Sequence, residues 1–145
     1  MLTTDQKGAI AEAEIAAAAI KLGIGVYKPM FEGGRYDLIF EVGSTLMRIQ
    51  CKWARREGEV VVVRCYSCRR GRDGMIVRKY TAAEVDAIAA YCPQTDRCYL
   101  LPTSLFCSRR LVHLRIAPSR NNQRSGINWA DAFGFEARLN ALSGP

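Results

Sequence analysis

The pattern of apolar and polar positions predicts an N-terminal helix followed by a series of short strands. Residues 3–5 are polar helix-start residues, and the alanine-rich segment after them ends near Gly23, a residue typical of helix C-termini. Runs rich in β-branched and aromatic residues then alternate with turn residues. They predict extended segments or strands over residues 25–30, 36–42, 45–53 and 59–66.

The second half of the chain mixes both patterns. Residues 67–74 are predicted to form a loop and 75–79 a short strand. Thr81-Ala-Ala-Glu84 resembles a capping box, which predicts a helix that runs to about Tyr91, before Pro93. Strands over 97–101 and 111–116 and a short helix over 128–133 complete the prediction. This order of elements predicts an α/β (α+β) fold in which helices flank a mixed β-sheet.

Length and composition favour a single folded domain over residues 1–145. Hydrophobic residues make up 49% of the 145 residues and charged residues 24%, which is typical of a folded soluble protein. The longest apolar run, 15–20, is far shorter than the roughly 20 residues of a membrane span. The first residues lack the pattern of a secretory signal. We therefore expect a cytoplasmic protein with no membrane partner.

The charge balance favours an acidic partner without identifying it. Lysine and arginine total 21 against 14 acidic residues, a net charge of +7, and 16 of the 21 are arginine. The arginine guanidinium is planar and suits phosphate groups and guanine edges. A basic surface alone is a weak signal, so nucleic acid remains one possibility among several at this point.

The cysteines allow a second hypothesis. Cys65-x2-Cys68 and Cys92-x5-Cys98 are two pairs that could form a four-cysteine zinc site, although the second spacing is wider than usual. Both pairs adjoin strand-like apolar runs, where cysteine acts as a small hydrophobic residue. Buried, reduced thiols are therefore the favoured interpretation. His113 is the only histidine, which excludes histidine pairs and histidine-rich metal sites.

The predicted hairpin over 36–53 concentrates the chemistry. A two-residue turn at Gly43-Ser44 places Asp37 directly opposite Gln50. Alternation then puts Asp37, Gln50 and Lys52 on one face, whereas the other face is almost wholly apolar. The polar face is either solvent-exposed, with a weak Asp37–Lys52 pair, or a divalent-metal site with Lys52 beside it. Glu41 shares this face and is expected to pair with Arg48.

The same residues resemble a known family. Asp37 is followed thirteen positions later by Gln50-Cys51-Lys52, and a helix with Gly8-x3-Glu12 precedes them. This arrangement resembles the PD-(D/E)xK nuclease superfamily, and in particular the branch of the cyanobacterial group I intron-encoded homing endonucleases, where glutamine replaces the last carboxylate. The resemblance continues over 80–86, 99–102, 114–118, 121–123 and 129–130. Tyr36 departs from the motif, which has proline at this position.

The resemblance implies a restriction-endonuclease-like core and a role for each matching residue. Asp37 would bind the metal, Lys52 would be the catalytic lysine, and Gln50 would occupy the remaining motif position. Glu12 would reach the site from the helix, and the backbone carbonyl of Cys51 would be a further metal ligand. The expected cofactor is Mg²⁺ or another divalent cation. The expected activity is sequence-specific hydrolysis of phosphodiester bonds in double-stranded DNA. Glu14 points to another side of the helix and is expected to be solvated.

Several basic and amide side chains are candidates for DNA contact. Each cluster alone fits a solvated loop better than a base-reading role, but together they suit phosphate contacts that position a few base-reading groups. The cluster over 69–72 follows the predicted site most directly. The candidates are Arg55, Arg56, Arg69, Arg70, Arg72, Arg120, Asn121, Asn122, Gln123 and Arg124.

Size implies self-association. A domain of this length presents too little surface to read a long target, and cutting both strands requires two active sites. The resemblance implies a homotetramer. Five aromatic residues are candidates for interface anchors, and ordinary core positions suit them at least as well: Tyr80, Tyr91, Trp129, Phe133 and Phe135. Two alternatives stay open: a structure-specific, junction-resolving nuclease and a non-catalytic DNA-binding protein on the same fold.

Overall fold

The N-terminal helix forms where the sequence predicts it. The structure is a computed structural model that describes residues 1–118, 121 and 125–142. Helix α1 spans Thr4–Lys21 and begins with a capping box, in which Thr3 and Gln6 bond to each other's backbone N–H groups. Ala11, Ile15 and Ala19 are its buried residues, and Gly23 follows with a φ of 82°. The apolar stripe of α1 therefore faces the protein interior.

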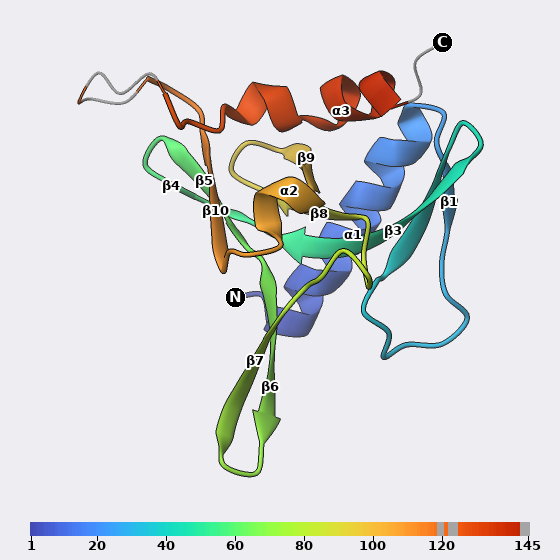
Figure 1. Cartoon of the computed structure of the whole chain (residues 1–145), viewed down its shortest axis with the longest axis vertical. Coiled ribbons are helices and arrows are strands. Elements are labelled where there is room, and N and C mark those ends of the chain that lie inside the picture. Colours follow the sequence, from blue (N-terminus) through green and yellow to red (C-terminus); the bar gives the residue numbers. More distant parts are fainter. Residues whose placement is uncertain (119–120, 122–124, 143–145) are drawn as a thin grey trace.

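A mixed five-stranded sheet occupies the centre of the molecule (Figure 1). Its strands are β1 (Gly25–Tyr27), β2 (Leu38–Val42), β3 (Thr45–Trp53), β8 (Ala87–Cys92) and β9 (Arg97–Pro102), in that order. Strands β3 and β8 are parallel, and the other neighbours are antiparallel. The expected mixed sheet is therefore confirmed.

Two smaller sheets complete the strands. The first contains β4 (Arg55–Glu57), β5 (Val60–Arg64) and β10 (Leu111–Arg115), in the order β10-β5-β4. The second is a hairpin of β6 (Tyr66–Gly71) and β7 (Gly74–Lys79), which projects away from the body of the molecule (Figure 1). The predicted strand over 59–66 thus divides between β5 and β6. The predicted loop over 67–74 is wrong, because most of it belongs to this hairpin.

The register of the β2–β3 hairpin agrees with the sequence prediction. Val42 pairs with Thr45 across the turn, and Leu38 pairs with Ile49 at the other end. The N–H of Asp37 also donates to the Ile49 carbonyl at 2.8 Å. Asp37 therefore lies opposite Gln50 at the end of β2, as predicted.

The predicted helix from Thr81 to Tyr91 is wrong. Residues 81–84 form a turn, and the next segment is strand β8, all six residues of which are buried. Ala87, Ala89 and Tyr91 pack in one core, whereas Ile88, Ala90 and Cys92 pack in the other. A strand buried on both faces has a continuous apolar sequence, and its alanines misleadingly favour a helix.

The central sheet separates these two cores. Helix α1 and α3 (Phe135–Leu142) cover one face, and the β10-β5-β4 sheet with α2 (Thr103–Phe106) covers the other. Helices thus flank the sheet as expected, and on the second face a further sheet packs beside α2. The 3-10 helix η1 (Ala130–Phe133) lies within the predicted helix over 128–133.

Most of the proposed interface aromatics belong to the interior. Tyr80, Tyr91 and Phe135 are 8% exposed or less, so they are core residues in this chain. Trp129 is 38% exposed and remains accessible. Among the described residues, no helix has the length and apolar character needed to cross a membrane.

Candidate active site

Asp37 directly precedes the first residue of β2, and its carboxylate is held against the neighbouring strand β3. The Cys51 N–H donates to Asp37 Oδ2 at 3.0 Å. Burial raises the pKa of Asp37 above its ordinary value, and the nearby charge of Glu12 acts in the same direction. The Cys51 N–H and the charge of Lys52 oppose this shift without cancelling it. Asp37 is thus a fixed and partly desolvated carboxylate.

Lys52 extends from β3 toward the base of the projecting hairpin. Its Nζ donates to the Tyr66 carbonyl at 2.8 Å and lies 5.0 Å from the centre of the Tyr80 ring. Burial lowers the pKa of Lys52, and the charges of Arg35 and Arg64 add to this effect, whereas Asp37 opposes it. The structure therefore brings Asp37 and Lys52 together as interacting charges in a partly buried place.

Gln50 and the Cys51 carbonyl lie beside this pair. Gln50 Nε2 donates to the Cys51 carbonyl at 3.3 Å, and the Gln50 side chain lines the same hollow as Asp37. The N–H and C=O of one strand residue point to the same edge of the strand. Since the Cys51 N–H bonds to Asp37, the Cys51 carbonyl also points to this edge, whereas its thiol is in the core.

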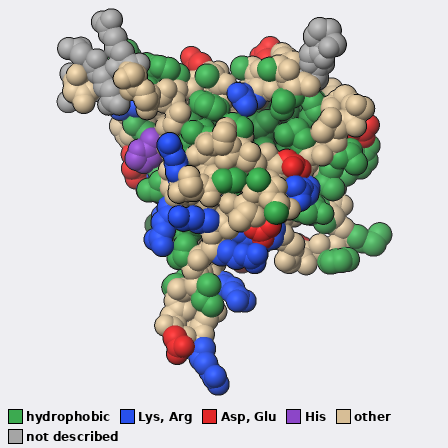
Figure 2. Space-filling view, viewed as in Figure 1, with side chains coloured by type: hydrophobic (Ala, Val, Ile, Leu, Met, Phe, Trp, Pro, Cys, Tyr) green, Lys and Arg blue, Asp and Glu red, His purple; other side chains and the backbone are tan. Residues whose placement is uncertain are grey.

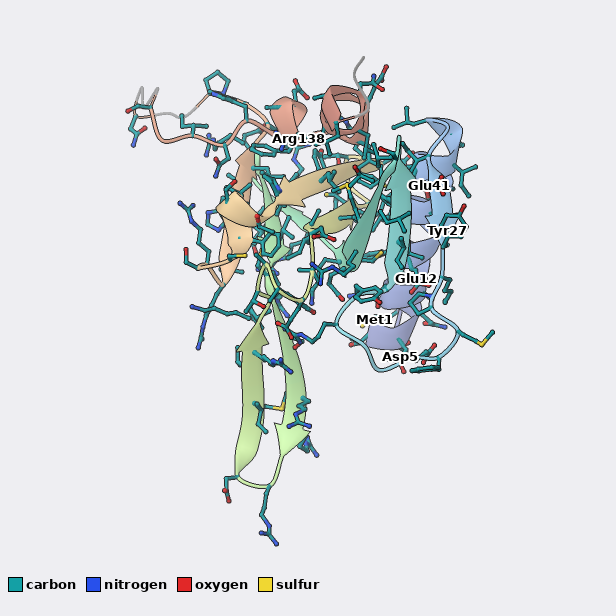
Figure 3. The ribbon with its side chains drawn as sticks, turned by 45° about the vertical axis from the view of Figure 1, so that its right-hand side comes forward. Met1, Asp5, Glu12, Tyr27, Glu41 and Arg138 are labelled. Atoms are coloured by element: carbon teal, nitrogen blue, oxygen red, sulfur yellow. The ribbon has the colours of Figure 1, made fainter. Side chains whose placement is uncertain are left out.

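Glu12 approaches the site from the middle of α1, as Figure 3 shows. It lines a hollow of about 300 Å³ together with Lys28 and Asp37. Lys28 Nζ donates to Glu12 Oε1, and this bond raises the pKa of Lys28. The structure thus places Glu12 and Asp37 around one hollow, which Glu32 also lines, with Lys28 as the present partner of Glu12.

Arg35 and Tyr80 form a wall of the site that the sequence analysis did not identify. The Arg35 guanidinium lies 4.2 Å from the centre of the Tyr80 ring, and Arg35 donates to Ser67 Oγ at 2.8 Å. It also pairs with Glu84 at 3.0 Å. Burial raises the pKa of Tyr80 to about 12. Arg35 therefore connects the β6–β7 hairpin to the edge of the site through hydrogen bonds.

The hairpin contributes one of its faces to the site. A hollow of about 480 Å³, the active-site hollow, is lined by Asp37 and Gln50 and by Arg69, Ile76 and Arg78 of the hairpin. Arg69 pairs with Ile76 across the two strands, so both lie on this face. Figure 2 shows lysine and arginine side chains gathered around the base of the hairpin.

The other predicted DNA-contact residues are more dispersed. Arg70, opposite Met75, lies on the far face of the hairpin, and Arg72 is exposed at its turn. Arg55 pairs with Glu57, and Arg56 pairs with Glu59. Asn121 is exposed in a turn after β10. Arg120, Asn122, Gln123 and Arg124 lie outside the described residues.

Two other carboxylates on these elements, Glu14 and Glu41, are not part of the candidate site. Glu14 is exposed on α1, as expected. Glu41 accepts a bond from the Tyr27 hydroxyl at 2.8 Å, and Figure 3 shows both at the outer edge of the sheet. The expected Glu41–Arg48 pair is wrong, because Arg48 bonds to Asp86 through both its backbone and its side chain.

The cysteines of the zinc hypothesis do not share a site. Cys65 and Cys92 are buried, and each thiol bonds to a group close by in sequence. Cys98 instead bonds to the Glu14 carbonyl of α1. Within the described part of the chain, no three His, Cys, Asp or Glu side chains are grouped as ligands for one metal ion.

Comparison with known proteins agrees with this geometry. The chain matches the model of the PD-(D/E)XK endonuclease family over residues 2–136. It is also similar to the structure of a bacterial homing endonuclease, I-Ssp6803I, with a TM-score of 0.78 and 27% identity, over 97% of this chain and 94% of that one. A search of curated proteins found no match. Because the family model spans nearly the whole sequence, the chain belongs to the PD-(D/E)XK endonuclease family.

Proposed function

We propose that this endonuclease is metal-dependent and cuts double-stranded DNA at a specific sequence. The observation that carries the proposal is the placement of Asp37 and Lys52 together at the ends of paired strands, beside a hollow lined by arginines. Its similarity to a homing endonuclease over almost the entire chain supports the same activity.

Carboxylate and carbonyl oxygens are the ligands that suit a hard divalent cation such as Mg²⁺. Asp37, Glu12 and the Cys51 carbonyl provide this set, with Asp37 already oriented by the Cys51 N–H. The cation, when bound, supplies positive charge to the reacting phosphate. Gln50 is neutral, so the site carries two carboxylates where the general motif would give three.

Lys52 has a separate role in the proposed reaction. An ammonium group has three N–H donors, of which the bond to the Tyr66 carbonyl uses one. We expect this bond to hold Nζ near the phosphate that reacts. Further N–H groups can then donate to a non-bridging phosphate oxygen or to the attacking water. In a partly buried place, such a donor stabilises the charge that develops in the transition state.

The contribution of Glu12 is testable apart from cleavage. We expect Glu12→Gln to raise the Mg²⁺ concentration that gives half-maximal thermal stabilisation by about tenfold, because one of two carboxylate ligands is lost. Glu14→Gln, two positions away on the exposed side of α1, is the matched control. Equal Mg²⁺ responses of the two variants would show that Glu12 is not a ligand.

The two faces of the hairpin are expected to differ in importance. Arg69→Gln should lower kcat/KM for DNA cleavage by about tenfold, the effect of losing one charge-assisted bond to phosphate. Arg70→Gln, on the opposite face, should have a smaller effect. Cleavage kinetics of both variants on one duplex make the comparison. A larger loss for Arg70→Gln would mean that the far face of the hairpin contacts the DNA near the cut.

We also propose that the protein assembles, as a homotetramer. In the connection between β1 and β2, Met30 is 100% exposed and Phe31 is 85% exposed, next to the hollow that contains Glu12. Exposed apolar side chains at such a position are typical of an interaction surface. Light scattering after gel filtration should give four times the mass of the chain. A monomeric mass would contradict the assembly.

The proposed activity can be tested without knowledge of the target. Purified protein is incubated with Mg²⁺ and a library of randomised linear duplexes, and the new ends are sequenced. We expect one recurrent sequence around the ends, and no new ends in the presence of EDTA. A branched-DNA substrate is included in parallel. Cleavage of the branched DNA alone, whatever its sequence, would indicate a junction-resolving nuclease instead.

A further inference from the structure

A second hollow is lined by Lys52 but not by Asp37. It measures about 740 Å³ and is bounded by the N-terminal part of α1, the end of β3, strands β4 and β5, and the base of the β6–β7 hairpin. Figure 1 shows the N-terminal end of α1 close to the base of this hairpin. We name it the basic groove, after the cations that line it: Lys7, Lys52, Arg55 and Arg64.

The charge of the basic groove is of one sign. Among the described residues that line it, four are cationic and none is acidic. Arg55 has an exposed partner, Glu57, outside this lining. Four like charges around one hollow repel one another, and the repulsion is relieved when a polyanion binds between them. The ligand class that fits the groove is therefore one with several negative charges along its length.

The groove adjoins the active-site hollow. Cys68 lines both of them, and Lys52, which lines the groove, interacts electrostatically with Asp37, which lines the active-site hollow. Trp53 forms a wall of the groove, where its ring packs edge-on against Tyr91 at 6.0 Å between ring centres. Lys7 lies 6.0 Å from the centre of the Trp53 ring. A DNA backbone with one phosphate at Asp37 could therefore extend past Lys52 into the basic groove.

We propose that the basic groove binds the backbone phosphates of the DNA duplex on one side of the bond that is cut, with Lys7 and Arg64 as contact residues. The inference rests on the proposed function and adds to it a direction for the DNA strand: from the active-site hollow, past Lys52, into the groove. Phosphate contacts of this kind set the register of a protein on DNA and carry no sequence information. Lys7 and Arg64 thereby position the scissile bond at Asp37.

The salt dependence of DNA binding tests the two contacts. Fluorescence anisotropy is measured with a mixed-sequence duplex of about 30 base pairs, in Ca²⁺ instead of Mg²⁺, over a series of KCl concentrations. Each of Lys7→Gln and Arg64→Gln should reduce the slope of log K against log salt by about 1. Lys21→Gln, at the other end of the same helix, should leave the slope unchanged. Equal slopes for all three variants and wild type would overturn the proposal.

Trp53 gives an independent measurement at the groove itself. The chain has two tryptophans, so Trp129→Phe leaves Trp53 as the only tryptophan. Iodide quenching of its fluorescence should fall when the duplex is added, since bound backbone excludes the anion. Unchanged quenching with fully bound duplex, or protection by single-stranded DNA alone, would overturn the proposal.

The outcomes separate this inference from the proposed function. If wild-type protein cleaves the duplex library while the groove variants bind like Lys21→Gln, the activity stands and the groove assignment is wrong. If wild-type protein neither binds nor cleaves duplex DNA, the proposed function itself is wrong, and the groove assignment falls with it.

Discussion

Replacing Lys52 with methionine is expected to lower the single-turnover rate of DNA cleavage by about 1,000-fold, while duplex binding changes far less. Loss of one preorganised donor to the reacting groups typically costs this much. Methionine keeps most of the apolar stem but removes the Nζ that bonds to Tyr66 and faces Asp37. Rates with the enzyme in excess over DNA separate this chemical effect from binding.

The same variant should make the folded protein more stable at neutral pH. Burial lowers the pKa of Lys52, which means that the charged ammonium group lowers the free energy of unfolding. This destabilisation is complete at pH values below the lowered pKa. Lys52→Met removes this destabilisation, and its advantage should shrink as the pH rises toward 10.5, the ordinary pKa of lysine. Chemical denaturation across this range checks the sign. Lys21→Met, at an exposed position, is the control.

Cleavage by Lys52→Met at the wild-type rate would refute a catalytic role for Lys52.

Replacing Asp37 with asparagine is expected to abolish both cleavage and the thermal stabilisation that Mg²⁺ gives to the wild-type protein. Asparagine retains an oxygen that can accept the Cys51 N–H, so the local backbone should persist. It lacks the negative charge that a divalent cation requires. Thermal melts with and without Mg²⁺ measure the effect. A wild-type Mg²⁺ response in Asp37→Asn would place the metal elsewhere.

Without metal, Asp37→Asn should be more stable than wild type at neutral pH. Burial raises the pKa of Asp37, so the ionised carboxylate destabilises the folded state above that pKa. The penalty disappears as the pH falls toward the ordinary value of 3.8, where wild type and variant should converge. A stability difference that grows on acidification would contradict the assigned direction. If both stability predictions hold, the two charges of the proposed site reduce stability, a cost that is consistent with a functional role.

The centre of the site was predictable because local geometry determines it. Glycine at the turn fixes the register of the β2–β3 hairpin, and alternation then fixes which side chains share a face. Asp37, Gln50 and Lys52 follow from these two rules alone. Helix α1 was equally predictable from its capping box and apolar spacing. Glu12, by contrast, was assigned through the family resemblance, since its approach to Asp37 depends on how the helix packs.

The errors arise where long-range contacts override local preference. Strand β8 contains alanine, which favours helices, yet its backbone pairs with β3 and β9 and both of its faces are buried. Arg35, Lys7 and Arg64 come from distant parts of the sequence and meet near Lys52 only in the folded chain. No spacing rule links such residues. The glycine residues at 71 and 74 were the available signal for the β6–β7 hairpin, flanking its turn.

The role of Asp37 in catalysis is decided by single-turnover cleavage, with Mg²⁺, of the duplex recovered from the randomised library. Wild type, Asp37→Asn and Glu41→Gln are compared, because Glu41 lies on the same hairpin but bonds to Tyr27. We expect no cleavage above background for Asp37→Asn and a rate within about twofold of wild type for Glu41→Gln, as is usual for a surface substitution. Cleavage by Asp37→Asn at the wild-type rate would contradict this role.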